Sequence, residues 1–242
     1  MSKQKLVLII QARMNSSRFP HKVVSDLNGA PLIERILQRV KKVKKIGKII
    51  IATTKRKDDD ILVNIAKLNK VEVFRGSEND LVDRYYQAAK KYKANLIVRV
   101  PGDNALPEPK EIDRVINYHN NNGNDFSSNF PDVAQHGYPH NGYPDGIGAE
   151  VINFEALKRI WNLSSSPRNR EHPHTNFYEN PKMFKIGVLE CPEEIRRPDI
   201  ILDINTKEQY EFVSEMYEYM TANYIEFGIR EVIKWYDNIY KK

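Results

Sequence analysis

The chain has 242 residues, of which 40% are hydrophobic and 29% charged, with a formal charge of +6; these values suit one globular α/β unit with a sizeable core. No apolar run approaches the roughly 18 residues of a membrane-spanning helix, and the start MSKQKLVLIIQ lacks a signal peptide's long apolar region and cleavage site, so we expect no membrane partner and a cytoplasmic location. The single cysteine, Cys191, excludes an internal disulfide and a cysteine-built metal site.

The first hundred residues alternate short β-branched runs with amphipathic segments. The runs KLVLII, KIIIAT, VEVF and NLIVRV do not alternate between apolar and polar positions, as expected of parallel strands buried between helix layers. The segments PLIERILQRVKK, DDDILVNIAKLNK and DLVDRYYQAAKKY between them have helical periodicity. Asp58, Asp59 and Asp60 open the second of these helices, where negative charge favours a helix start, so we expect them to cap it. The pattern predicts a doubly wound, mostly parallel, Rossmann-like α/β sheet.

The rest of the chain is predicted as an insertion followed by C-terminal helices, within a single domain of residues 1–242. Residues 123–190 are expected to form an irregular insertion over the ligand edge of the sheet, because much of this stretch is rich in Asn, Gly, Pro, Tyr and His. Residues 206–242 predict two amphipathic helices. We expect the aromatic side chains of this segment to help form a homodimer, and the alternative is that they dock on the chain's own core. These side chains are Tyr217, Tyr219, Tyr224, Phe227, Trp235, Tyr236 and Tyr240.

Ligands of an open parallel sheet bind beyond the carboxyl ends of its strands, so functional residues are sought in the loops there. The loop QARMNSSRFPHKV, after the first run, carries Arg13, Arg18 and Lys22. Guanidinium forks and a lysine point charge match the spread oxygens of a triphosphate, although an exposed basic loop is the alternative. Lys22 is expected to have little to pack against. Further donors in the loop are Asn15, Ser16 and Ser17.

Two later acids are candidate metal ligands. Asp103 follows NLIVRV in the turn PGDNALPEP, and Asp203 ends the short apolar run IILDIN. Either residue alone could serve only as a turn former or helix cap. Magnesium prefers one or two carboxylates together with substrate phosphate oxygens, so two acids facing a basic loop predict a Mg²⁺ site.

These segments together resemble the cytidylyltransferases that include the CMP-Kdo synthetases, and most closely the spore-coat polysaccharide cytidylyltransferase-like branch. QARMNSSRFPHKV is similar to the family's first-loop signature, and FRGSENDLVDRYYQAAKKY, VRVPGDNAL and RRPDIILDINTKEQYEFV are similar to later family segments. The likeness covers most of residues 5–215. It implies that Arg13, Lys22 and Asp103 are catalytic and that Asp103 and Asp203 hold Mg²⁺. It also implies a nucleotide site formed by Ala12, Arg13, Asn15, Ser16, Arg18, Lys22, Gly76, Ser77, Asp80 and Arg84.

Histidines concentrate in residues 123–190, which we expect to bind the molecule that accepts the transferred CMP group. Four of the six histidines lie between positions 136 and 174. With Arg170 they could bind a carboxylate, phosphate or phosphonate. The alternative is that RNREHPHTNF only starts a helix. A histidine-built zinc site is disfavoured, because no cysteine is near and the pair at i, i+2 suits a helix face poorly. YPDGIGAEV and REHPHTNFYEN also resemble the spore-coat branch, and the predicted acceptor-binding residues are His136, His140, Asp145, Arg170, His172 and His174.

The resemblance implies transfer of CMP from CTP to a small acidic acceptor, with release of pyrophosphate. One competing interpretation is a sugar-nucleotide-dependent glycosyltransferase, although a clear Asp-x-Asp at a strand end is missing. Another is a non-catalytic nucleotide- or RNA-binding domain that owes its charge to a phosphate-backbone partner. Many lysines, such as those at 41, 42, 44 and 45, lie in short runs typical of a solvated helix end. We therefore expect no polymeric nucleic acid as a partner.

Overall fold

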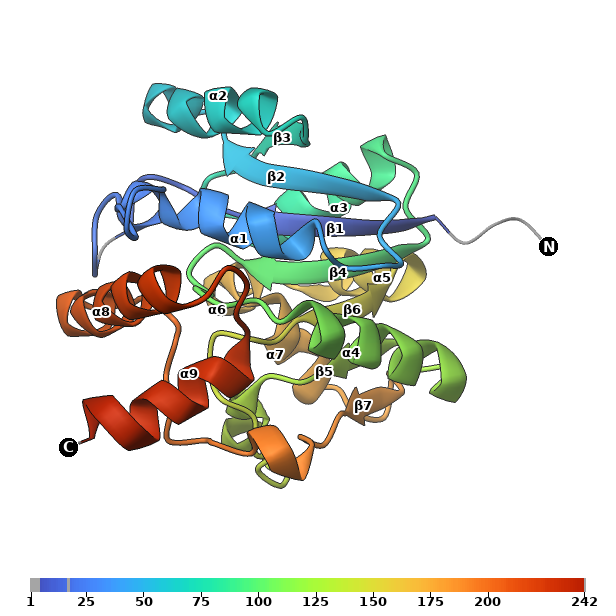
Figure 1. The fold of residues 1–242 in the computed structure, drawn as a ribbon. Coiled ribbons are helices and arrows are strands. Elements are labelled where there is room, and N and C mark those ends of the chain that lie inside the picture. The colour runs from blue at the N-terminus through green and yellow to red at the C-terminus, as the bar shows by residue number, and fades with distance from the viewer. Residues whose placement is uncertain (1–4, 17, 242) are drawn as a thin grey trace.

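The computed structural model describes residues 5–16 and 18–241, so Ser17, predicted to bind phosphate, lies outside the described residues. Its centre is a seven-stranded sheet of order β3-β2-β1-β4-β6-β5-β7 (Figure 1). The β1–β2, β1–β4, β2–β3 and β5–β7 pairs are parallel, and β6 runs antiparallel to β4 and β5. The predicted, mostly parallel α/β sheet is confirmed. The strands are β1 (Leu6–Gln11), β2 (Lys48–Thr54), β3 (Glu72–Gly76), β4 (Leu96–Pro101), β5 (Phe126–Ser128), β6 (Glu150–Asn153) and β7 (Ile186–Val188).

Helices cover both faces of the sheet, and each face has its own core. One core takes Leu8 and Ile10 of β1 and the other takes Val7 and Ile9, which explains why that strand is apolar on both faces. The first core is covered by α1 (Leu32–Val40), α2 (Asp60–Leu68), α4 (Pro109–Asn122), α8 (Lys207–Asn223) and α9 (Ile229–Trp235). The second is covered by α3 (Leu81–Lys91), α5 (Phe154–Leu163) and α7 (Pro173–Tyr178).

Short helices complete the connections between these elements. α6 (Pro167–Glu171) lies between α5 and α7 along the chain. The 3₁₀ turns are η1 (Lys22–Val24), η2 (Lys57–Asp59), η3 (Pro131–His136) and η4 (Glu193–Ile195), and a π-helical turn, η5 (Tyr236–Tyr240), follows α9. Within the described part of the chain, no helix is long and apolar enough to span a membrane.

The region 123–190 differs from the irregular insertion that the sequence predicts. It contributes β5, β6 and β7 to the main sheet, and α5 and α7 to one of its helix layers. Irregular backbone is concentrated between Asn129 and Ala149, which connect β5 to β6 and include η3. The region is therefore part of the fold's framework, and only this connection is irregular over many residues.

The C-terminal helices pack their aromatic side chains into the chain's own core. Tyr217 and Trp235 are each 2% exposed, and Tyr219, Tyr224, Phe227 and Tyr236 pack against the same core. Tyr240 remains 42% exposed but contacts Phe212 and Trp235. These contacts account for the aromatic side chains without a second copy of the chain. The homodimer stays a prediction, and the aromatic content no longer argues for it.

Candidate active site

A cavity of about 490 Å³ opens at the carboxyl ends of β1 and β4, where the sequence predicts the ligand site. Its wall is formed by the first loop, residues 78–84, the turn after β4 and the α6 region. Asn15 is exposed and lies outside this lining. Because cations and carboxylates from separate segments share the wall, the cavity suits a charged ligand. The predicted residues that line it are Ala12, Arg13, Ser16, Arg18, Lys22, Arg84, Asp103 and His172.

Asp59 fixes the first loop against β2. Its carboxylate accepts hydrogen bonds from the Met14 amide at 2.8 Å, from the Thr54 amide at 3.1 Å and from the Thr54 hydroxyl. Burial alone would raise the pKa of Asp59, but the hydrogen bonds outweigh it and hold the pKa below its usual value. The prediction that this residue caps the second helix is wrong, since its side chain makes no capping hydrogen bond. It positions the loop instead.

Lys22 joins the first loop to the two predicted metal-binding segments. Its Nζ donates to Asp103 Oδ2 at 2.8 Å, to the Ile204 carbonyl at 2.9 Å and to Asn205 Oδ1 at 3.1 Å. Arg18 donates to the same Asn205 oxygen at 2.7 Å. Lys22 is only 8% exposed, so the expectation that it has little to pack against is wrong. These contacts hold the ammonium in place at the cavity wall.

The turn after β4 brings Asp103 to the cavity. Pro101 ends β4 opposite Gln11 of β1, and a Cβ added to Gly102 would lie 2.4 Å from the Gln11 carbonyl oxygen. Only glycine allows so close an approach of the two strand ends. The Ile204 amide donates to the Asp103 carbonyl at 2.9 Å, and residues 104 and 203 form an isolated antiparallel bridge. The backbones of residues 103–104 and 203–204 are thereby paired. Asp103 lines the cavity, whereas Asp203 lies outside its lining and accepts hydrogen bonds from the side-chain amides of Asn205 and Gln209.

Asp145 lies near Asp103 and Asp203 and also near Asp132, whose carboxylate approaches the predicted acceptor-binding His174. Burial, followed by the charges of Asp145 and Asp103, raises the pKa of Asp203. Burial and the nearby Asp132 and Asp103 charges raise the pKa of Asp145, against the opposing hydrogen bond from the Gly146 amide. Crowded carboxylates of this kind repel one another, and a bound cation would relieve the repulsion. The two predicted Mg²⁺ ligands fit that role on chemical grounds.

The predicted nucleotide residues between 76 and 84 divide into framework and lining. Asp80 caps α3 by accepting a hydrogen bond from the Asp83 amide at 2.8 Å. Arg84, 3% exposed, donates to the carbonyls of Ser77 at 2.7 Å and Glu78 at 3.0 Å, and so holds the loop. Glu78, Asn79 and Arg84 line the cavity, whereas Gly76, Ser77 and Asp80 lie outside its lining.

Arg13 reaches across the cavity to two other segments. It donates to the Glu78 carbonyl at 3.0 Å and to Glu171 Oε1 of α6 at 3.2 Å. Glu171 is more than half exposed, so this ion pair is a weak one that an anionic ligand can displace. The guanidinium therefore lies where the first loop, residue 78 and α6 meet.

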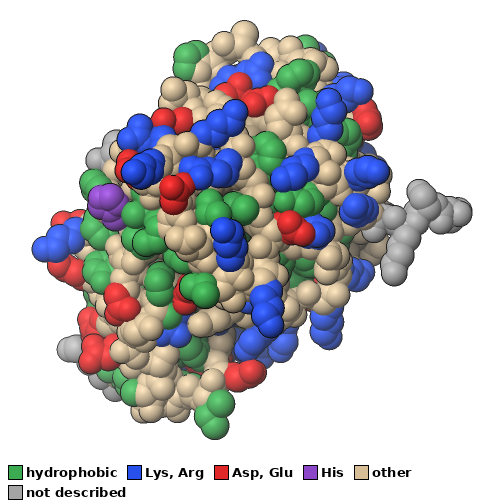
Figure 2. All heavy atoms as spheres, turned by 90° about the horizontal axis from the view of Figure 1, so that it is seen from above, with side chains coloured by type: hydrophobic (Ala, Val, Ile, Leu, Met, Phe, Trp, Pro, Cys, Tyr) green, Lys and Arg blue, Asp and Glu red, His purple; other side chains and the backbone are tan. Residues whose placement is uncertain are grey.

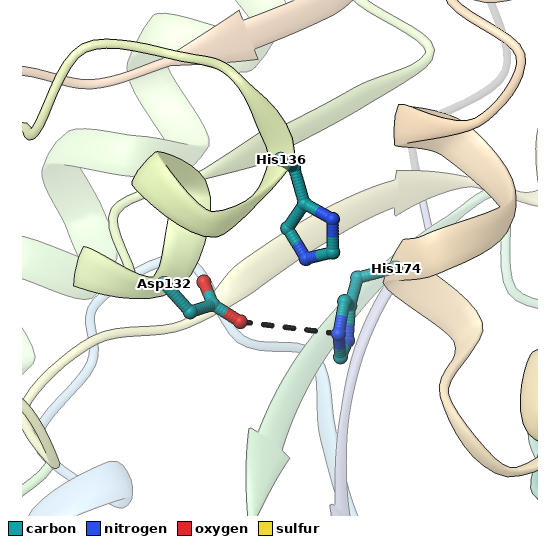
Figure 3. A group of neighbouring side chains, drawn as sticks. All are labelled: Asp132, His136 and His174. Atoms are coloured by element: carbon teal, nitrogen blue, oxygen red, sulfur yellow. Dashed lines mark ion pairs between the residues drawn. The ribbon is translucent and has the colours of Figure 1, made fainter.

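The structure brings three of the predicted acceptor-binding histidines together, since the rings of His136 and His172 lie 5.5 and 5.8 Å from that of His174, but Arg170 and His140 make other contacts. Arg170 donates to the carbonyls of Trp161 at 2.9 Å and Ser164 at 2.7 Å and pairs with Asp80 at 3.2 Å, so it joins helices and lies outside the lining. His140 is exposed, and its Nδ1 accepts a hydrogen bond from the Gly142 amide in a local turn. Of the four predicted histidines, His172 alone is part of the cavity lining given by the described residues. His136 and His174 approach Asp132 instead (Figure 3).

Several lining residues were missed by the sequence reasoning. Glu78, Asn79 and Glu171 lie in loops or a short helix, where a single polar residue carries no distinctive pattern. Arg99 had a usable signal, because it is a charge inside a buried strand. Its guanidinium pairs with the fully buried Glu150 at 2.5 Å, and its Nε donates to Gln11 Oε1 at 3.0 Å. This paired charge lies inside β4 and also lines the cavity.

Comparisons with known proteins agree with this arrangement. The chain matches the family described as "Cytidylyltransferase" over residues 7–230. It is 36% identical over 233 residues to an uncharacterized protein of Methanocaldococcus jannaschii, covering 96% of this chain and 90% of that one. It is 32% identical over 218 residues to the spore coat polysaccharide biosynthesis protein SpsF of Bacillus subtilis, covering 88% of this chain and 86% of the relative.

A solved structure is also similar along nearly the whole chain. A cytidylyltransferase from Leptospira borgpetersenii superposes with a TM-score of 0.87 at 29% sequence identity, covering 99% of this chain and 96% of the other. The predicted resemblance is therefore confirmed. Basic first loop, glycine–aspartate turn and converging acids occur here in a chain that belongs to the cytidylyltransferase family, a family of nucleotidyltransferases.

Proposed function

We propose that this nucleotidyltransferase uses CTP and Mg²⁺ to transfer CMP to a small acidic acceptor, with release of pyrophosphate. The observation that carries the proposal is the meeting of Arg13, Arg18 and Lys22 with Asp103 at one cavity. Cations of this kind bind phosphates, and carboxylates bind a hard metal ion. The proposed acceptor is an acidic sugar, a sugar phosphate or a phosphonate.

The triphosphate of CTP would lie along the first loop. Lys22 and Arg18 already share Asn205 as an acceptor, and Arg13 contacts a displaceable surface carboxylate, so all three can exchange a protein oxygen for a phosphate oxygen. During transfer the acceptor oxygen forms a bond to the α-phosphorus while the bond to the β-phosphate oxygen breaks. The cations offset the charge that grows on the leaving pyrophosphate, which makes electrostatic positioning the main catalytic contribution.

Asp103 and Asp203 would hold Mg²⁺, with Asp145 as a third carboxylate beside them. Burial, and after it the charges of neighbouring acids, raise the pKa values of Asp145 and Asp203, and a cation among these carboxylates would offset both effects. When bound, Mg²⁺ would neutralise phosphate charge and orient the triphosphate. Lys22 now pairs with Asp103, so it is positioned between the acid and the phosphates.

His172 remains the proposed acceptor-binding histidine, because it lines the cavity beside Glu171. Burial lowers the pKa of His172, so near neutral pH its ring is an uncharged donor and acceptor rather than a fixed cation. Arg99 also lines the cavity. Its guanidinium would bind the anionic group of the acceptor, the role predicted for Arg170 from the sequence. We propose Arg99 and His172 as acceptor contacts in place of Arg170 and His140.

Pyrophosphate release tests the proposal. CTP should be the preferred nucleotide among CTP, ATP, GTP and UTP, with a panel of acidic sugars, sugar phosphates and phosphonates as acceptors. Asp103→Asn and Asp203→Asn should both abolish Mg²⁺-dependent release, because an amide lacks the anionic oxygen that a hard cation prefers. Asp199→Asn is the matched control, because Asp199 pairs with Arg197 and Lys241 outside the cavity lining.

Three outcomes would contradict the proposal. Another nucleotide reacting tenfold faster than CTP, a difference of about 1.4 kcal/mol in transition-state binding, would remove the specificity claim. Release of a nucleoside diphosphate from a sugar nucleotide would indicate glycosyl transfer. Tight, salt-dependent RNA binding would favour the nucleic-acid interpretation. Figure 2 shows acidic side chains among the lysines and arginines of one face, which does not suggest a continuous basic patch on that face.

A further inference from the structure

A second cluster of potential metal ligands lies beyond the nucleotide cavity. Asp132 and His136 come from η3, and His174 comes from α7. One ligand atom from each lies within 4.8 Å of the other two, and Figure 3 shows the three side chains turned toward one another. Elements far apart in the chain therefore present one carboxylate and two imidazoles to a common point.

Polar groups at this point are close to one another but are not hydrogen-bonded. His174 Nε2 lies 3.9 Å from Asp132 Oδ2, and His174 Nδ1 lies 3.8 Å from Glu150 Oε1, both beyond hydrogen-bond range. Among the described residues, seven buried side-chain atoms lack a hydrogen-bond partner, and three of them belong to Asp132, Glu150 and His174. Because buried polar atoms are costly to leave unpaired, their concentration here calls for a ligand.

The charges of the cluster favour a cation. Glu150 is fully buried, and its other oxygen pairs with Arg99 at 2.5 Å. The Asp132 carboxylate faces the same space without a cation of its own within ion-pair range, apart from the His174 ring at 3.9 Å. Two carboxylates thus share one guanidinium among the residues that the structure describes. A divalent ion would balance the excess negative charge.

We propose that Asp132, His136 and His174 bind a zinc-class divalent transition-metal ion, and that Glu150 orients the His174 ring from behind. Imidazole nitrogen suits zinc and its neighbours, whereas Mg²⁺ and Ca²⁺ prefer oxygen ligands throughout. Ligand atoms about 2.1 Å from a tetrahedral ion lie about 3.4 Å apart, so the present spacing needs only a small contraction. A carboxylate behind a metal-binding histidine is a common supporting contact.

This site differs from the zinc site that the sequence disfavours. That argument concerned His172 and His174, two positions apart, whereas the structure pairs His174 with His136 of η3. The ion would link η3 to α7. His172, two residues before His174, lines the nucleotide cavity, so the ion would stabilise one part of that cavity's wall without contacting the reaction. The inference is independent of which nucleotide or acceptor the enzyme uses.

Metal titration of the full-length chain tests this site. After metal removal by a chelator, calorimetry with Zn²⁺ should give one tight equivalent in the wild type. Addition of Co²⁺ should give the visible absorption of a four-coordinate ion with nitrogen and oxygen ligands. His136→Ala, at a partly exposed position, should weaken Zn²⁺ binding by about 100-fold or more, because loss of even a residue that only supports a ligand typically costs about 10–100-fold.

Two controls separate this site from others. His140→Ala removes an exposed histidine of the same connection, and Asp203→Asn removes a proposed Mg²⁺ ligand, and both should leave Zn²⁺ affinity within about twofold of wild type. Circular dichroism of each variant checks that it folds. Absence of tight Zn²⁺ binding in the wild type, its survival in His136→Ala, or its loss in either control would overturn the proposal.

Discussion

Lys22 shows how one side chain can serve both the fold and the chemistry of this enzyme. Its three hydrogen-bond acceptors belong to Asp103, in the turn after β4, and to residues 204 and 205. They lie between 81 and 183 positions after Lys22 in the chain. A buried ammonium with three partners is well satisfied and loses little freedom when an anion binds. The same contacts aim its charge at the cavity.

Lys22→Ala should therefore lower both activity and stability. Removal of one preorganised charge typically costs about a hundredfold or more in rate. Asp103 and Asn205 would also lose a buried donor, so the free energy of unfolding should fall by about 1–3 kcal/mol. Pyrophosphate release and urea unfolding measure the two effects. Lys48→Ala, which breaks the exposed pair with Glu72, is the control and should change neither by much. Unchanged activity in Lys22→Ala would contradict the proposal that Lys22 binds the phosphates of CTP.

The sequence predicted individual site residues well where a charged side chain lies in a loop at the expected ligand edge of the sheet. Arg13, Arg18, Lys22 and Asp103 were expected at the site because they lie in loops that follow buried strands, and all four line the cavity. Arg170 was misassigned because composition cannot tell a guanidinium that binds a ligand from one that joins helices through backbone carbonyls. That distinction depends on packing between segments, which local sequence does not specify.

The ends of β1 and β4 are held together by a contact that only glycine permits. Gly102→Ala would place a methyl group 2.4 Å from the Gln11 carbonyl oxygen, so the strand ends must separate. We expect a loss of about 1–3 kcal/mol in the free energy of unfolding, as for overpacked sites. A large loss of pyrophosphate release should accompany it, because Asp103 is the next residue.

Gly47→Ala provides the matched control for that substitution. Its added Cβ would lie 3.1 Å from the Leu6 carbonyl oxygen, at the opposite end of β1 from the cavity. It should cost less stability and leave pyrophosphate release near the wild-type rate. Equal damage to activity in both variants would mean that general sheet distortion, rather than displacement of Asp103, explains the Gly102 result.

His119 connects α4 to β5 and β6 in a way that acid should weaken. Its buried ring contacts Ser127 Oγ at 3.0 Å and Asn153 Oδ1 at 3.2 Å, and burial lowers its pKa below 6.5. As the pH falls below about 6.5, the unfolded chain binds a proton that the folded chain does not, so stability falls. Urea unfolding at pH 8 and pH 5.5 should show the decrease.

A variant isolates this contribution from those of other groups. His119→Gln keeps polar atoms toward Ser127 and Asn153 without a titrating ring, so its stability should fall less than that of the wild type between the two pH values. An equal decrease in both proteins would assign the acid sensitivity to other groups, such as the buried His174.

The predictability of the elements follows from their length and partners. The first four strands have five to seven residues and apolar patterns that identify them locally. β5, β6 and β7 have only three or four residues, such as FSS and IGV, and form through pairing with distant segments. Runs this short show no periodicity, and for that reason residues 123–190 were predicted to be an irregular insertion.

At the scale of the whole molecule, the cavity is where distant parts of the chain meet. The first loop, residues 78–84, the turn after β4 and the α6 region all contribute to its wall, and residues 204 and 205 hold Lys22. These segments come from both halves of the chain. A ligand bound among them connects parts that the sheet alone holds at a distance, so binding should stabilise the complete fold.

CTP with Mg²⁺ should therefore raise the melting temperature of the full chain. A ligand at about 100 times its dissociation constant adds about 2.7 kcal/mol of stability, which corresponds to roughly 5–10 °C for a chain of this size. Lys22→Ala should reduce the shift, and Asp203→Asn should remove the part that depends on Mg²⁺. ATP, GTP and UTP at the same concentration should give smaller shifts, because we expect the cavity-lining segment that includes Glu78 and Asn79 to contact the base. Equal shifts with all four nucleotides would show that the cavity binds only the triphosphate and would leave cytosine specificity without a structural basis.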